Sequence, residues 1–110
     1  MKNKTTNNKK AVERNEFRKN KVSGHPVYIY KKVGRRYEFI GVTHAEITQG
    51  VRNIKLERSP NPKDTKEAYI RPKSESLKEN KFSKQPYKGW KFTEKDKLKV
   101  DKVKNKKRTK

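Results

Sequence analysis

The sequence predicts an α+β fold: a small antiparallel sheet based on one β-hairpin, with one short helix, flanked by basic disordered or helical arms. Apolar residues make up only 27% of the 110 residues and charged residues 41%, so the chain can bury only one small core. The β-branched and aromatic residues that favour strands lie mostly in its middle. We expect a basic N-terminal arm (1–23), a small β-rich domain (24–73), a linker with an aromatic anchor (74–92) and a Lys-rich C-terminal helix or tail (93–110).

A β-hairpin is the clearest predicted element. Residues 26–33 and 36–43 have the composition of strands, and Gly34-Arg35 between them suits a two-residue type II′ turn. That turn fixes the register by pairing the flanking residues step by step outward. The register gives one face with the aliphatic pairs Val27/Val42 and Ile29/Ile40, and one with the aromatic and basic pairs Tyr28/Gly41, Tyr30/Phe39 and Lys32/Tyr37.

Shorter elements follow the hairpin. Thr43 and Glu46 fit a capping box, which predicts a short helix over 44–49. Residues 51–58 favour a third strand, and residues 68–71 favour a short strand that Pro72 ends because proline cannot donate to a ladder.

A second capping sequence predicts a helix near the C-terminus, beginning after Thr93. Its apolar residues, Leu98, Val100 and Val103, form no good stripe, so we expect the helix to form only on contact.

The charge predicts the class of partner. The chain has 33 Lys and Arg residues against 12 Asp and Glu residues, which gives a formal net charge of +21. Such an excess favours a polyanion, and nucleic acid is the commonest one. The Lys-dense C-terminal region is suited to following a phosphate backbone without reading its sequence. A solubility tail or a targeting signal is the alternative interpretation.

Several function classes are excluded by what the sequence lacks. Without cysteine there are no disulfides, thiol nucleophiles or Cys-ligated zinc. No long apolar run predicts a membrane span, and no apolar stretch follows the basic N-terminus, so we expect a cytoplasmic protein. Glycine-rich phosphate loops, nucleophile elbows and clustered carboxylates are also missing. We therefore expect no cofactor, no metal, no membrane contact and no small-molecule substrate.

An aromatic and basic surface is the main candidate site. Single-stranded nucleic acid is bound by rings that stack on bases and by cations that bind phosphates. The alternative is that the rings form the core and the cations line a solvated turn. The predicted nucleic-acid-binding residues are Tyr28, Tyr30, Lys31, Lys32, Arg35, Arg36, Tyr37, Arg52, Arg71, Lys73, Lys88, Trp90 and Lys91.

Trp90 is the only tryptophan, and it lies in a strip where aromatic residues alternate with lysine and glycine. Such a strip resembles a nucleic-acid contact. A lone tryptophan in an apolar-poor chain is more often an anchor that ties a segment to the core, and we favour that interpretation.

The two histidines, His25 and His44, face each other at the open end of the hairpin in the predicted register. Two facing imidazoles are suited to act as base and acid in phosphodiester cleavage. Binding a metal needs a third ligand, for which Glu46 is the best candidate. The alternative is a pair of surface residues that flank Pro26 and a helix cap.

The central half of the chain resembles small, highly basic, uncharacterised proteins of bacterial mobile elements. The resemblance lies in Gly24 to Tyr28, Gly41 to His44, 61–64 and 68–70, and it implies a context and no particular activity. A looser resemblance, to the barnase/colicin/RelE-like ribonucleases, rests on His25, His44, Tyr69 and Arg71 among short strands. It implies cleavage of RNA without a metal.

We therefore predict a small nucleic-acid-binding protein that holds RNA, favoured over single-stranded DNA, with the hairpin face and flexible cationic arms. The first alternative is a toxin-like, metal-independent endoribonuclease with His25 and His44 as catalytic residues. The second is an inhibitor that binds an acidic protein partner.

Overall fold

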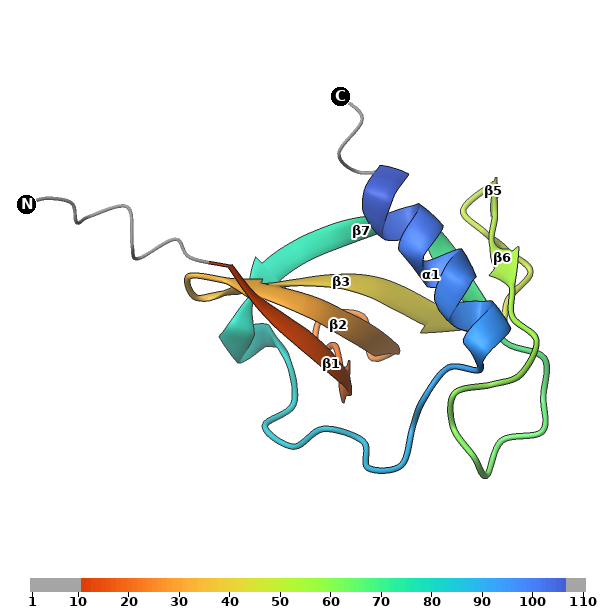
Figure 1. The fold of residues 1–110 in the computed structure, drawn as a ribbon, viewed down its shortest axis with the longest axis horizontal. Helices are drawn as coiled ribbons and strands as arrows, with labels where there is room; N and C mark the ends of the chain where they lie inside the picture. Colours follow the sequence, from red (N-terminus) through yellow and green to blue (C-terminus); the bar gives the residue numbers. More distant parts are fainter. Residues whose placement is uncertain (1–10, 107–110) are drawn as a thin grey trace, which may run out of the picture.

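The structure, a computed structural model, describes residues 11–106 and has an α+β architecture (Figure 1). Its centre is a five-stranded antiparallel sheet in the order β1-β2-β3-β7-β6. These strands are β1 (Ala11–Lys19), β2 (Pro26–Val33), β3 (Arg36–Thr43), β6 (Ile54–Lys55) and β7 (Tyr69–Lys78). The other elements are a hairpin of β4 (Ile47–Thr48) and β5 (Val51–Arg52), the 3-10 helix η2 (Glu79–Lys81) and the helix α1 (Glu94–Lys106).

The sheet buries side chains on both faces. On one face, α1 and the segment before it cover a cluster of Phe17, Tyr28, Tyr30, Ile40, Val42, Leu56, Ala68, Ile70, Phe92, Val100 and Val103. On the other face, the segment after β7 packs Phe82 against Val27, Ile29, Tyr37 and Phe39. Burial on both sides explains why the strands are aromatic-rich in a chain with so few apolar residues.

The predicted hairpin is present, and its turn is confirmed. Gly34 has a φ of 63°, and Arg35 is not among the residues with positive φ, as a type II′ turn requires. Close to the turn the pairing is as predicted, with Lys32 opposite Tyr37.

A bulge between Ile29 and Lys31 then shifts the register by one residue, so that Tyr28 pairs with Ile40 and Ile29 with Phe39. The prediction of one aliphatic and one aromatic face is therefore wrong, because the shift puts tyrosines and aliphatic residues on both faces.

The predicted helix over 44–49 is wrong, since these residues enter the β4–β5 hairpin. Gln49 and Gly50 have φ values of 51° and 78°, which suit the two central positions of a type I′ turn. The Thr43 hydroxyl accepts a hydrogen bond from the Ala45 backbone N–H (3.1 Å) and so caps a turn rather than a helix. The predicted strand over 51–58 is present only as β5 and β6, which are separated by the buried Asn53.

Strand β7 does not end at Pro72 but continues to Lys78, contrary to the prediction. Pro72 lies where the β3–β7 register shifts, and β6 pairs with β7 only at Tyr69 and Ile70. A proline is tolerated at such an irregular edge position.

The predicted domain boundaries also need correction. Residues 11–19 of the expected N-terminal arm form the edge strand β1, and residues 74–78 of the expected linker belong to β7. Residues 1–10 and 107–110 of the predicted arms lie outside the described residues. The C-terminal helix is confirmed as α1, and Thr93 caps it by accepting a hydrogen bond from the Asp96 N–H (3.1 Å).

Candidate functional site

The tyrosines predicted to stack on bases are buried in the core. Tyr28, Tyr30 and Tyr37 are only 8%, 5% and 6% exposed, so the prediction of an open aromatic face is wrong. The Tyr28 hydroxyl donates to Asn15 (3.0 Å) and the Tyr30 hydroxyl to Glu38 (3.2 Å). Burial raises the pKa of Tyr28, with nearby carboxylates adding to the effect. These rings therefore stabilise the fold, as the alternative interpretation held.

Many of the predicted phosphate-binding cations are engaged within the fold. Lys32 forms an ion pair with Glu79 (2.9 Å), which lowers the pKa of that carboxyl. The other engaged residues contact neighbouring side chains: Lys31 contacts Glu38, Arg36 contacts Ser76, Arg52 contacts Glu46 and Arg71 contacts Asn53. The remaining predicted cations are exposed, namely Arg35, Lys73, Lys88 and Lys91.

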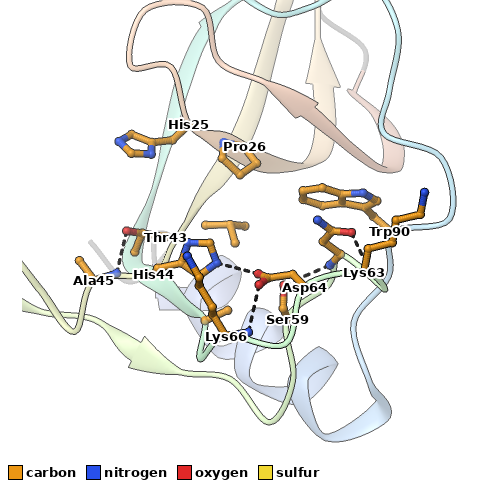
Figure 2. A pocket seen from close by; sticks show the side chains of 13 residues that line it. His25, Pro26, Thr43, His44, Ala45, Ser59, Lys63, Asp64, Lys66 and Trp90 are labelled. Atoms are coloured by element: carbon orange, nitrogen blue, oxygen red, sulfur yellow. Dashed lines mark hydrogen bonds and ion pairs between the residues drawn. The ribbon is translucent and has the colours of Figure 1, made fainter.

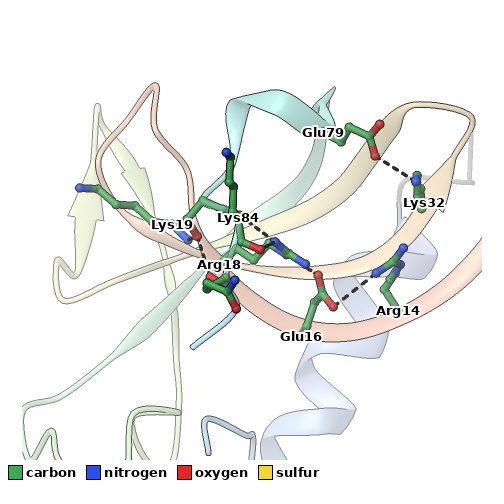
Figure 3. Close-up of polar contacts among 9 residues, drawn as sticks. Arg14, Glu16, Arg18, Lys19, Lys32, Glu79 and Lys84 are labelled. Atoms are coloured by element: carbon green, nitrogen blue, oxygen red, sulfur yellow. Dashed lines mark hydrogen bonds and ion pairs between the residues drawn. The ribbon is translucent and has the colours of Figure 1, made fainter. Parts of the chain in front are cut away.

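Three cations lie around the buried ring of Tyr37, namely Arg14, Arg18 and Lys32, which Figure 3 shows. The charged groups of Arg14, Arg18 and Lys32 lie 5.6, 5.8 and 6.0 Å from its centroid. Arg18 also donates to the backbone oxygens of Ser83 and Lys84, both at 2.7 Å. These contacts hold the segment after β7 against the sheet.

That segment creates a band of exposed cations. It runs from the β2–β3 turn, where the Glu79 N–H donates to the Arg35 oxygen (2.8 Å), to the end of β1, where the Lys21 N–H donates to the Lys81 oxygen (2.8 Å). Lys84 of this segment and Lys19 at the end of β1 both extend into solvent (Figure 3). The backbone contacts of the segment bring together six exposed cations from these parts of the chain. We call them the cationic band: Lys19, Lys21, Arg35, Lys78, Lys81 and Lys84. Of these only Arg35 was predicted, because the backbone contacts that assemble the band join distant parts of the chain.

A cavity of about 570 Å³ lies at the open end of the β2–β3 hairpin, away from the Gly34 turn (Figure 2). Its walls come from the start of β2, the end of β3, the loop 59–66 and the segment before α1. The lining residues are His25, Pro26, Val42, Thr43, His44, Ala45, Ser59, Asn61, Lys63, Asp64, Lys66, Ala68 and Trp90.

Within this cavity His44 is oriented by a carboxylate. Its Nε2 lies 2.6 Å from Asp64 Oδ2, and Asp64 Oδ1 accepts from the Lys66 N–H (3.0 Å). The His44 hydrogen bond, followed by the Lys66 backbone bond, lowers the Asp64 pKa to about 2. An ionised carboxylate can only accept a hydrogen bond, so His44 donates to Asp64 through its Nε2–H group. In the neutral imidazole ring, Nδ1 is then the nitrogen that can accept a proton.

His25 and His44 line the same cavity, but they are not a facing strand pair. The bulge at Tyr30 shifts the register, and the β2–β3 pairs end at Val27 and Gly41. The prediction that the two rings face each other across the ladder is therefore wrong. Glu46, the proposed third metal ligand, pairs with Arg52, and residues 11–106 contain no cluster of three metal-ligating side chains.

Trp90 is confirmed as an anchor. Its ring stacks on Tyr87 with centroids 4.4 Å apart and lies 5.7 Å from Phe17, which joins the 87–92 segment to the core. The same ring borders the cavity beside Lys63 (Figure 2). Anchoring and contact with a ligand therefore do not exclude each other here.

No protein-family model, curated protein or solved structure matches this chain. The resemblances to mobile-element proteins and to ribonucleases therefore stay predictions. Neither helix in the described part of the chain has the length and apolar character needed to cross a membrane.

Proposed function

We propose that this protein binds single-stranded nucleic acid, with RNA favoured over DNA, by neutralising phosphates along the cationic band. The observation that carries the proposal is the convergence of exposed cations from β1, the β2–β3 turn and the segment after β7. Clustered surface cations bind a phosphate backbone and release its counterions without reading sequence.

The distribution of acidic residues supports the same conclusion. Glu79 lies between the band residues Lys78 and Lys81, and its carboxylate forms an ion pair with Lys32. Elsewhere in residues 11–106 most carboxylates are paired within the fold, for example Glu16 with Arg14 and Asp101 with Lys104. The exposed surplus of cations is therefore available to an external polyanion.

Replacing Lys19, Lys81 and Lys84 with glutamine tests the band. The slope of log affinity against log salt should become shallower by about 2 for single-stranded RNA, at roughly 0.7 per lost phosphate contact. A matched control changes three exposed lysines that pair with acidic residues elsewhere, Lys55, Lys95 and Lys97. Equal slopes for both variants would contradict the band as the binding surface.

The alternative of an acidic protein partner is tested with polyglutamate in the same assay. We expect RNA to bind more tightly than polyglutamate of equal charge, because binding to nucleic acid releases the counterions condensed on its phosphate backbone. Stronger binding of polyglutamate would favour the inhibitor interpretation instead.

A second candidate function is metal-independent cleavage of RNA, and it is favoured by the orientation of His44 by Asp64 in a cavity that His25 also lines. The 2′-hydroxyl oxygen would attack phosphorus to form a 2′,3′-cyclic phosphate as the bond to the 5′-oxygen breaks. His44 Nδ1 would take the hydroxyl proton, and His25 would give a proton to the leaving oxygen.

Under this hypothesis, single-stranded RNA is cut in excess chelator with a bell-shaped pH dependence, and a 2′-deoxy substrate is left intact. His44→Ala should lower the rate by about 10²-fold or more while binding through the band persists. Lys102→Gln, an exposed change outside the cavity, serves as the control. RNA that stays uncut from about pH 5 to 8 would rule out the hypothesis.

A further inference from the structure

We propose that the cavity lined by His44 and Trp90 binds one unpaired nucleotide, with the base on its apolar wall and the phosphate at its cationic rim. This inference rests on the proposed function and adds to it a site for the base. The band would contact phosphates, which paired and unpaired strands both carry, so the preference for a single strand in the proposed function needs a second site that contacts a base.

The size and the wall of the cavity suit a base. Its volume of about 570 Å³ falls within the usual range for small-ligand sites, roughly 300–1,000 Å³. Pro26, Val42, Ala68 and the Trp90 ring supply apolar surface at the ends of β2 and β3 and next to the core. Bases bind such surfaces through their flat faces, largely independently of sequence.

The rim of the cavity suits a phosphate. Lys63 and Lys66 are exposed and line it, together with His25 (Figure 2). The one carboxylate of the lining, Asp64, is engaged by His44 and by the Lys66 N–H, which offsets its repulsion of an anion.

The loop that carries these residues is held in place before any ligand binds. The Asp64 N–H donates to the Asn61 oxygen (3.0 Å), and the Lys63 N–H donates to the Asn61 side chain (3.0 Å). The Asn61 N–H in turn donates to the Ser59 hydroxyl (3.2 Å). A preformed loop lowers the entropic cost of binding.

The ligand must be unpaired for a geometric reason. In a duplex the base edges are paired and the faces are stacked, so a base reaches a cavity in a protein only from a single strand, a loop or an end. A single strand can therefore occupy the band and the cavity, whereas a duplex can occupy the band alone.

Trp90 makes the proposal directly measurable, because it is the only tryptophan in the chain and it borders the cavity. Adenosine monophosphate and a single-stranded RNA should each change the tryptophan fluorescence in a saturable way. N-acetyltryptophanamide corrects for absorption by the base. A duplex of equal length should bind without the fluorescence change.

The double substitution Lys63→Gln and Lys66→Gln should weaken the adenosine monophosphate response by about tenfold or more, the effect of losing one charged hydrogen bond. The matched control, Lys95→Gln with Lys102→Gln, changes two exposed lysines outside the lining and should leave the response unchanged.

The outcomes separate the two proposals. RNA that binds with no fluorescence change, or a response that the Lys63 and Lys66 changes leave intact, would overturn the nucleotide site while the band stands. Failure of both RNA and adenosine monophosphate to bind would overturn both. A saturable adenosine monophosphate response without RNA binding would overturn the proposed function and leave a site for free nucleotides.

Discussion

Replacing Asp96 with alanine is expected to lower the free energy of unfolding by about 3 kcal/mol. Asp96 is fully buried beneath the first turn of α1. Its carboxylate accepts from the backbone N–H groups of Glu57 (2.7 Å) and Arg58 (3.2 Å), so it joins the helix to the segment after β6. Alanine leaves both donors without this partner. Urea unfolding followed by circular dichroism measures the change.

The matched control for this prediction is Asp101→Ala on the same helix. Asp101 pairs with Lys104 (3.5 Å), three residues later, just as Asp96 pairs with Lys99 (3.4 Å), but Asp101 is exposed. Its replacement should cost no more than about 0.5 kcal/mol, because exposed ion pairs contribute little. Equal losses for the two variants would show that Asp96 does not hold the helix in place.

Replacing Tyr28 with alanine is expected to cost about 4 kcal/mol of stability. Its ring packs against Phe17 and Phe92, with centroid distances of 5.1 and 4.9 Å, in the cluster beneath α1. Truncation removes this contact area and leaves a cavity in the core. Thermal or urea unfolding would measure the loss.

Tyr28→Phe keeps the ring and removes only the hydroxyl that donates to Asn15, so it should cost about 1 kcal/mol. RNA affinity should be unchanged in the phenylalanine variant. A folded alanine variant of normal stability that has lost RNA affinity would contradict the core position of this ring and restore the stacking interpretation.

The local signals in the sequence predicted the elements that depend on neighbouring residues. Gly34 specified the hairpin turn, and Thr93 specified the start of α1. The bulge at Tyr30 could not be predicted from neighbouring residues. Both the predicted and the observed registers give strands with apolar residues on each face, so the sequence pattern does not distinguish them. The helix lacked an evident apolar stripe because Asp96 takes a buried position in line with Val100 and Val103.

The candidate site was predicted only in part. Trp90 and the two histidines were identified from composition, and the cavity brings all three together. Asp64 was not recognised, since its contact with His44 joins residues from a strand end and a distant loop. The cationic band was missed for the same reason, because it depends on backbone contacts of the segment after β7 with β1 and the β2–β3 turn.

The most direct test of nucleic-acid binding is the affinity of the full-length protein for a single-stranded RNA at a series of salt concentrations, with DNA of the same sequence alongside. Phosphate neutralisation predicts a linear fall of log affinity against log salt, with a slope of about −0.7 for each phosphate contacted. We expect the same behaviour for DNA at lower affinity. Absence of binding at low salt, or an affinity that does not change with salt, would contradict the proposal.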